Sequence, residues 1–264
     1  MKKYIRNDEE NINNSNDKML NVIDCIFEDR EISFIDITKK LNIPKSTLNR
    51  ILSSLVKSEF IEKNQTNEKY RLGFKFIYYS ETIKSKLSIV NITEGIIKDL
   101  AKSTGETVNL GILYNDYVLN ILSVKGEESA LTSILIPMSP LNCSATGKIF
   151  LAYKNDLEQK EYFKNNHYEK RTIKTICTFE DFKKEQNQIL KTAISCDNEE
   201  YEYGLFCIAS PLKNHTGIIN AAISITGPKV RMEIKGIDYI KKELSEKVTL
   251  VNEILIKIKF NLTY

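Results

Sequence analysis

A proline-led apolar stripe constrains the first third of the chain most strongly. Pro44 suits the first turn of a helix, where its missing N–H costs nothing. Apolar residues then recur at helical spacing as Leu48, Ile51, Leu52 and Leu55. Off this stripe the helix start carries hydroxyls, an amide and two cations, which are groups that bind base edges and phosphate oxygens. Taken alone, the pattern is equally typical of an ordinary amphipathic surface helix.

The flanking segments favour DNA binding over that ordinary helix. An apolar pattern between residues 32 and 41 predicts a short helix, which ends before Pro44 because the residue preceding a proline is pushed away from the helical region. A short helix, a tight break and a longer helix form a helix-turn-helix. We predict that the second helix contacts DNA through Lys45, Ser46, Thr47, Asn49 and Arg50. For Thr47 a role in supporting the turn is the alternative.

A hairpin directly after this helix predicts a wing. Residues 60–63 and 69–73 alternate around the Asn-rich segment 64–68, which is typical of two short strands joined by a turn. We predict phosphate contacts from its cations Lys63, Lys69 and Arg71. For Arg71 a salt bridge inside the wing domain is an equal alternative.

Charge and length agree with a small DNA-binding domain joined to a larger one. The chain has 264 residues and a net charge of only +3, yet residues 39–75 hold nine basic residues against three acidic ones. A basic patch over the reading head is expected of a duplex binder. Five cysteines without a Cys-x-x-Cys pair predict reduced thiols in a cytoplasmic protein with no metal site and no cofactor. No apolar run is long enough for a membrane span.

Periodicity along the chain predicts four parts. These are a disordered tail (1–16), the winged helix-turn-helix domain (17–75), a linker helix (76–89) and a second domain (90–264). In the second domain we expect strands at 107–113, 117–124, 131–138, 205–212 and 218–226. Helices are expected at 146–153, 157–165, 182–193 and 232–260. This mixture predicts an α+β fold with antiparallel hairpins.

Several motifs in this order resemble the IclR-type transcriptional regulators. They are Pro44-Lys45-Ser46-Thr47, Gly105-Glu106-Thr107-Val108-Asn109-Leu110, Ala145-Thr146-Gly147-Lys148, Asp197-Asn198-Glu199-Glu200-Tyr201 and Ile223-Ser224-Ile225-Thr226-Gly227-Pro228. The resemblance implies an N-terminal winged helix, a GAF-like mixed-sheet effector-binding domain, and a homodimer or a dimer of dimers. The sequence departs from the family pattern at segment 191–195, where the family commonly has a Gly-aromatic pair. This departure can alter how the chain enters a strand.

Carried over by position, the resemblance implies an effector site. Its residues are Ala145, Thr146, Asp197, Cys207, Ser224 and Thr226. Ser224 and Thr226 share one strand face, and Thr146 lies at a helix start, where a carboxylate binds well. The alternatives are a core role for Cys207 and the two strand hydroxyls, and a turn role for Asp197. Thr172 and Thr175 lie near the pocket in the family pattern, and a structural role in a loop is the alternative for both.

We therefore expect a DNA-binding transcriptional regulator, a repressor, controlled by a small organic acid. Its expected partners are a double-stranded DNA operator and the acid, with no membrane. Asp197 is expected to accept a hydroxyl proton from the acid, and Glu199-Glu200 to be solvated turn residues. The implied site has no cation to pair with the carboxylate of the organic acid, unless Lys148 turns inward.

Catalysis has little support in the sequence. His167 and His215 lie in polar, turn-like surroundings, and no nucleophile-histidine pair with motif support is present. The open alternative is an enzyme on a GAF-like fold with Cys143 or Cys207 as a redox thiol. A redox or iron–sulfur regulator is a further alternative, but it would need clustered cysteines.

Overall fold

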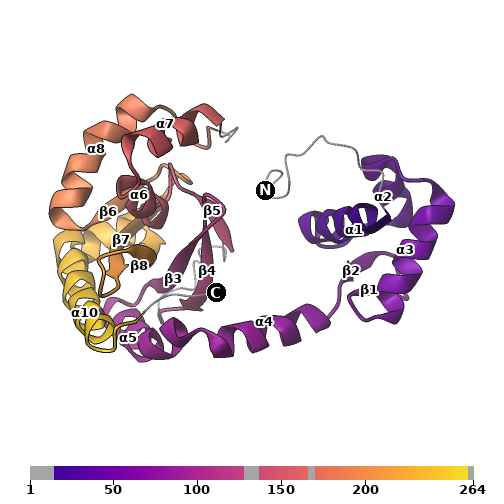
Figure 1. The fold of residues 1–264 in the computed structure, drawn as a ribbon, viewed down its shortest axis with the longest axis horizontal. Helices are drawn as coiled ribbons and strands as arrows, with labels where there is room; N and C mark the ends of the chain where they lie inside the picture. Colours follow the sequence, from indigo (N-terminus) through magenta and orange to yellow (C-terminus); the bar gives the residue numbers. More distant parts are fainter. Residues whose placement is uncertain (1–14, 128–136, 166–169, 261–264) are drawn as a thin grey trace. The chain divides into compact units, whose positions relative to one another are not determined.

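The chain folds into two compact units, Met1–Lys86 and Leu87–Tyr264, which are described separately here. The computed structural model describes residues 15–127, 137–165 and 170–260 (Figure 1). None of the helices in these ranges is long and apolar enough to cross a membrane. The predicted boundaries at 75/76 and 89/90 bracket the division at Lys86/Leu87.

The first unit is a winged helix-turn-helix. Its elements are α1 (Ser15–Asp29), α2 (Phe34–Leu41), α3 (Lys45–Lys57), β1 (Ile61–Lys63), β2 (Tyr70–Leu72) and α4 (Lys75–Lys86). Ser33 begins α2 by accepting a hydrogen bond from the Asp36 N–H at 3.2 Å. Asn42 ends α2 in the left-handed conformation at φ 48°. The predicted helix-turn-helix is thus confirmed, and α1 already includes two residues of the predicted tail.

Buried apolar residues from α1, α2, α3 and the wing form one core. Val22, Ile37, Leu48 and Leu52 are each no more than 1% exposed, and Ile61 of β1 completes the cluster. The wing hairpin pairs in antiparallel register as predicted. The remaining predicted tail residues, 1–14, lie outside the described residues.

The second unit is built on one six-stranded antiparallel sheet. Its strands are β3 (Thr107–Tyr114), β4 (Tyr117–Val124), β5 (Met138–Pro140), β6 (Ser195–Asn198), β7 (Leu205–Lys213) and β8 (Ile219–Pro228). They lie side by side in the order β5-β4-β3-β8-β7-β6. The hairpins β3-β4 and β7-β8 were predicted, and both are confirmed.

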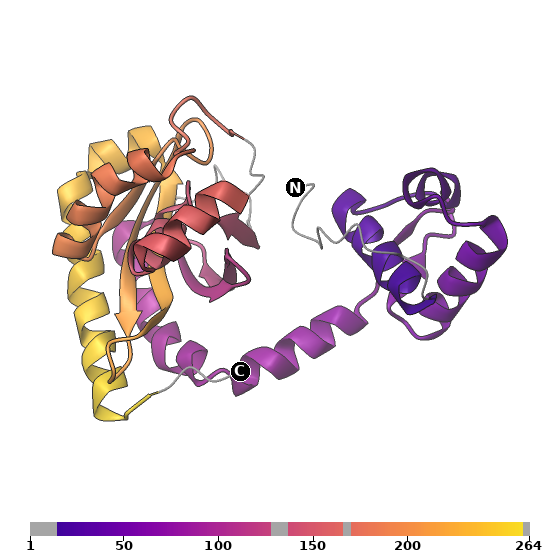
Figure 2. The same ribbon diagram turned by 45° about the horizontal axis from the view of Figure 1, so that its top comes forward.

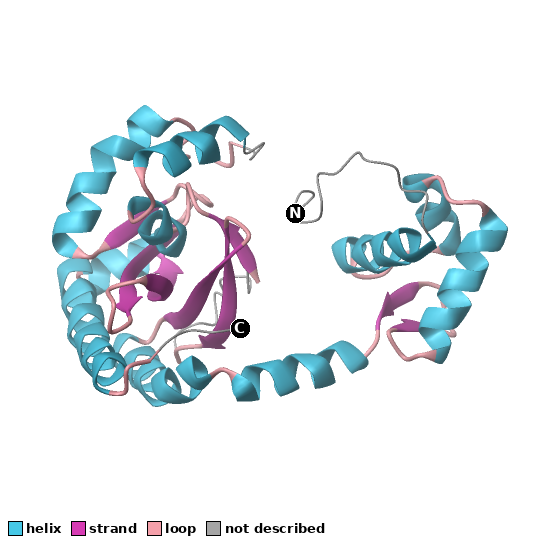
Figure 3. Ribbon diagram, viewed as in Figure 1, coloured by secondary structure: helices cyan, strands magenta, loops and turns pink. Residues whose placement is uncertain are grey.

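Helices cover both faces of this sheet (Figures 1 and 2). On one face, α5 (Ser88–Thr104) and α10 (Ile237–Lys257) pack against alternate apolar residues such as Val108, Leu110 and Ile225. On the other, α6 (Ala145–Ala152) and α8 (Phe179–Thr192) pack against Ala209 and Ala222. Two further helices, α7 (Asp156–Asn165) and α9 (Lys229–Lys235), complete the unit (Figure 3).

The structure differs from the sequence-based expectation in four places. The sheet of the second unit, expected to be mixed, pairs its described strands antiparallel throughout, because no parallel crossover joins them. The segment Ser195–Asn198, expected to form no strand, is β6 at the sheet edge. The terminal helical region is divided into α9 and α10 at Gly236, whose φ of 90° no other residue adopts readily. The strand expected at 131–138 overlaps β5 only at Met138, and residues 131–136 lie outside the described part of the chain.

Candidate DNA-binding surface and effector pocket

The start of α3 presents the side chains that the sequence assigned to DNA. Lys45, Ser46, Asn49 and Arg50 are exposed, whereas Thr47 is half-buried. Among the described residues neither Lys45 nor Arg50 makes an ion pair or a side-chain hydrogen bond. Both cations are therefore available to a polyanion without first breaking an internal contact.

The wing cations differ in their surroundings. Arg71 donates from Nε and Nη2 to one oxygen of Glu62, at 3.1 and 2.9 Å, and Lys63 pairs with Glu68 at 2.9 Å. These pairs are solvent-exposed, and exposed pairs contribute at most about 1 kcal/mol each. A phosphate can therefore replace either carboxylate at small cost. Lys69 forms no ion pair within the described ranges.

A pocket lies on the α6 side of the sheet, lined by fifteen residues from β3 to β8 and from the start of α6. All six residues implied for the effector line it: Ala145, Thr146, Asp197, Cys207, Ser224 and Thr226. Strand pairing explains why they meet, since Asp197 is opposite Cys207 and Cys207 is opposite Thr226. The cavity volume is about 70 Å³, whereas one water needs roughly 10–15 Å³, so the space suits a small molecule.

Ser144 fixes the helix start that faces the pocket. Its Oγ accepts from the Gly147 N–H at 3.1 Å and donates to the Pro140 carbonyl at 2.7 Å. A Cβ at Gly147 would come within 2.5 Å of Leu141 Cα and the Pro140 oxygen, so only glycine lets α6 approach β5 this closely. Ala145 and Thr146 therefore lie in the first turn of a rigidly held helix, where backbone N–H groups favour an anion.

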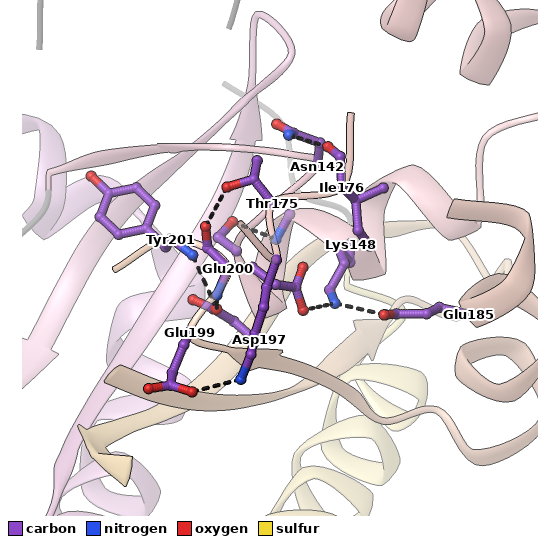
Figure 4. Close-up of polar contacts among 12 residues, drawn as sticks. Asn142, Lys148, Thr175, Ile176, Glu185, Asp197, Glu199, Glu200 and Tyr201 are labelled. Carbon is purple, nitrogen blue, oxygen red and sulfur yellow. Dashed lines mark hydrogen bonds and ion pairs between the residues drawn. The ribbon is translucent and has the colours of Figure 1, made fainter. Parts of the chain in front are cut away.

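Asp197, one of the residues drawn in Figure 4, is almost completely buried, at 1% exposure, and lines the pocket. Its Oδ1 accepts the N–H groups of Glu200 and Tyr201, at 2.8 and 3.2 Å. Its Oδ2 has no N–H or O–H partner among the described residues, and the Cys207 thiol interacts with the carboxylate as a weak donor. Burial raises the pKa of Asp197 to about 6, although the two N–H bonds oppose the shift. Asp197 therefore makes the turn contacts that the sequence gave as the alternative, and its side chain also lines the pocket.

Lys148 does not turn into the pocket. It is 0% exposed, and its Nζ lies 2.5 Å from Glu200 Oε1 and 2.6 Å from Glu185 Oε2 (Figure 4). Burial opposes its charge, but the two carboxylates raise the pKa of Lys148, so it stays cationic. The expectation that Glu200 is a solvated turn residue was wrong, because Lys148 draws its carboxylate inside, where burial raises its pKa to about 7.

The neighbouring loop holds the Asp197 turn from outside. Thr172 Oγ1 donates to the Glu199 carbonyl at 2.7 Å, and Thr175 Oγ1 donates to the Glu200 carbonyl at 2.8 Å. Neither threonine lines the pocket. Glu199, also expected to be solvated, pairs with Lys174 and Lys229, and these cations lower its pKa to about 2. The turn is therefore fixed by side chains from several segments.

Sequence reasoning missed several pocket residues. The polar ones are Thr107, Asn109, Asn120, Ser123, Lys125, Ser139, Ser144 and Tyr201. A signal for two of them was present, since Thr107 and Asn109 alternate with the buried Val108 and Leu110. Ser123, opposite Asn109, donates to its Oδ1 at 2.6 Å. Lys125 supplies the lining cation that the sequence analysis sought at Lys148.

The thiols do not have the surroundings of redox or metal-binding cysteines. Burial raises the pKa of both Cys143 and Cys207, which keeps them protonated and weakly nucleophilic. Within the described ranges there is no group of histidine, cysteine and carboxylate side chains that could hold a metal ion. His215 contacts the Phe260 carbonyl at 3.3 Å, while His167 lies outside the described residues.

Comparison with family models covers both units. The model described as "Bacterial transcriptional regulator IclR C-terminal" matches residues 81–252. The MarR family model matches residues 16–71, which span the helix-turn-helix and wing. The first match alone extends over more than half of the chain.

Curated relatives and solved structures agree with these matches. The transcriptional regulator XynR of Escherichia coli is 27% identical over 87% of this chain and 92% of its own length. The regulator KdgR of Escherichia coli is 25% identical over 94% of this chain and 92% of its own. The crystal structure of Thermotoga maritima IclR superposes with a TM-score of 0.71 and 29% identity, covering 90% of this chain and 97% of that one. The chain therefore belongs to the IclR family of DNA-binding bacterial transcriptional regulators.

Proposed function

We propose that this regulator is a repressor whose operator affinity is controlled by a small organic acid in the pocket between the sheet and α6. One observation carries the proposal. The six positions that the family resemblance implies, spread from Ala145 to Thr226, line a single cavity. The enzyme alternative is not favoured, because both thiols it requires are buried and protonated.

The chemistry of the lining supports an acid. The carboxylate would take the N–H groups of the first turn of α6 near Thr146, and the other end would contact Cys207, Ser224 and Thr226. Asp197 Oδ2 is an open hydrogen-bonding position for a hydroxyl or carbonyl of the acid. The small cavity and the absence of Lys148 from the lining disfavour nucleotides and large phosphorylated ligands.

A dimeric reading head is part of the proposal. None of the α4 residues is buried, and Phe74, Ile77, Tyr78 and Ile83 are all more than half exposed. Such a row of large apolar side chains is typical of a helix that packs against a second copy. We propose a homodimer or a dimer of dimers on a palindromic operator, acting in the cytoplasm where that DNA lies. Coupling of about 1–3 kcal/mol between the acid and DNA would suffice for regulation.

Replacing Arg50 by alanine is expected to weaken operator binding by about 1–3 kcal/mol, because an exposed guanidinium at the start of α3 would contact a base edge. Gel-shift titration on the DNA upstream of the gene itself measures this loss. The matched control is Lys57→Ala, an exposed cation in the last turn of the same helix, which should change affinity much less. Equal losses in both variants, or wild-type binding that does not weaken with salt, would contradict the assignment.

Thermal-shift screening with pyruvate, lactate, glycerate, gluconate and benzoate tests the pocket. At least one acid should raise the melting temperature, and Ser224→Ala and Thr146→Ala should reduce that shift, since each removes a hydroxyl that lines the cavity. Ser245→Ala on α10, behind the opposite face of the sheet, is the control. A panel without any hit, or hits indifferent to both pocket variants, rules out the site. A hit should also change the gel-shift affinity of the wild-type protein.

A further inference from the structure

Asp197 poses an electrostatic difficulty for an anionic effector. The pocket that offers α6 N–H groups to a carboxylate also holds this buried carboxyl group. Among the described residues, one of its oxygens has no N–H or O–H partner, and the Cys207 thiol is only a weak donor. Two negative charges enclosed in so small a cavity would repel each other strongly. A nearby cation would remove the difficulty, so the charged groups around Asp197 decide how an acid can bind.

No cation forms an ion pair with Asp197 among the described residues, although Lys148 lowers its pKa at longer range. Lys148 of α6, the closest candidate, is already taken by Glu200 and by Glu185 of α8. Lys125 also lines the pocket, but it is exposed and follows β4, which is four strand positions away from β6 in the sheet. On β7 the facing group is the protonated Cys207 thiol, and Cys143 is protonated as well.

The loop beside the turn does not supply the missing charge either. Arg171 stacks its guanidinium 3.8 Å above the Tyr201 ring and donates from Nε to the Tyr201 carbonyl at 2.8 Å. Glu200 and Tyr201 meet Asp197 through their backbone N–H groups, and both bonds go to Oδ1. Near Asp197, the cation Lys148 is therefore already shared by the carboxylates of Glu185 and Glu200.

We infer that Asp197 carries a proton on Oδ2 when an organic acid occupies the pocket, so that the effector binds together with one proton from solvent. Resting on the effector role proposed above, the inference makes Asp197 a specificity-determining residue. The protonated carboxyl group donates a hydrogen bond from Oδ2 to an oxygen of the acid, while Oδ1 keeps its two N–H bonds. No other bond forms or breaks, and the net charge of the pocket changes as if a neutral acid had bound.

The pH dependence follows from the proton that must be added. Burial raises the pKa of unliganded Asp197 to about 6, so the group is mostly ionised at pH 8 and mostly protonated at pH 5. An anion that requires the protonated form should bind about 90-fold more weakly at pH 8 than at pH 5. A neutral amide of the same shape can donate to the ionised carboxylate and should show little dependence.

Isothermal titration of the full-length protein tests the inference. The probes are lactate and glycerate, each beside its primary amide, at pH 5, 6, 7 and 8 and in buffers of different ionisation enthalpy. At pH 7 the wild-type protein should take up about 0.9 proton per acid bound, and none per amide. Asp197→Asn keeps an Oδ1 acceptor and places an N–H donor at the Oδ2 position, so it should bind the acids without proton uptake and with equal affinity from pH 5 to 8.

Glu200→Gln is the matched control, because burial also raises the pKa of Glu200 to about 7. It should retain proton uptake, while Lys148 keeps Glu185 as a partner. Three results would each overturn the inference and leave the proposed effector pocket unaffected. They are acid binding without proton uptake in the wild type, proton uptake that persists in Asp197→Asn, and proton uptake that is lost only in Glu200→Gln. If neither lactate nor glycerate binds the wild-type protein at any pH, the inference is overturned as well. The proposed function would still stand if pyruvate, gluconate or benzoate binds and that binding depends on Ser224 and Thr146.

Discussion

Replacing Lys148 by methionine should destabilise the second unit by about 3–5 kcal/mol. The substitution leaves the buried Glu200 carboxylate without its cation, and an uncompensated buried charge is among the costliest single changes in a protein. The loss should shrink as pH falls. Without Lys148 the pKa of Glu200 rises further above its present value of about 7, so the full loss appears above neutral pH and protonation relieves it as pH falls through neutrality.

Denaturant unfolding, followed by circular dichroism, measures this loss as a lower midpoint of the transition of the second unit. Lys183→Met is the control, because its pair with Asp156 at 3.0 Å lies on the surface and should cost less than about 1 kcal/mol. The double variant Lys148→Met/Glu200→Gln should recover much of the loss by removing the buried charge. A destabilisation below 1 kcal/mol for Lys148→Met, or no recovery in the double variant, would contradict the role assigned to this ion pair.

Replacing Glu106 by glutamine should cost a similar amount, about 3–5 kcal/mol, in the same unfolding experiment. Glu106 is 0% exposed, and its two oxygens receive Arg231 at 2.5 and 2.6 Å and Lys235 at 3.0 Å. These bonds hold α9 against the beginning of β3. Glutamine preserves the shape but leaves two partly buried cations facing each other without a counter-charge.

Glu62→Gln provides the matched comparison, since Glu62 also accepts a forked arginine, Arg71, but at the surface of the wing. We expect a change of less than about 1 kcal/mol there. The two units should unfold in separable transitions, so Glu106→Gln should shift only that of the second unit. A shift of equal size in both variants would show that burial of Glu106 does not set the strength of this contact.

The sequence by itself determined the elements whose patterns are local. The stripe of α3, the left-handed stop at Asn42 and the alternation of β1 and β2 each depend on residues within a few positions of one another, so the winged helix could be predicted. The two long hairpins were predicted for the same reason. The six effector positions came from family motifs, because composition and periodicity gave no reason to bring Thr146 and Asp197 together.

Only the tertiary structure decided the charge state and surroundings of the pocket. The strand β6 has four mostly polar residues, too few for a readable alternation, and it forms because β7 offers its free edge. The buried helix α6 can hold the charged Lys148 because Glu185 and Glu200, which are 37 and 52 residues away in the chain, accept its hydrogen bonds. The free energy of a buried charge depends on partners that are distant in the chain, and no local pattern records where they come to lie.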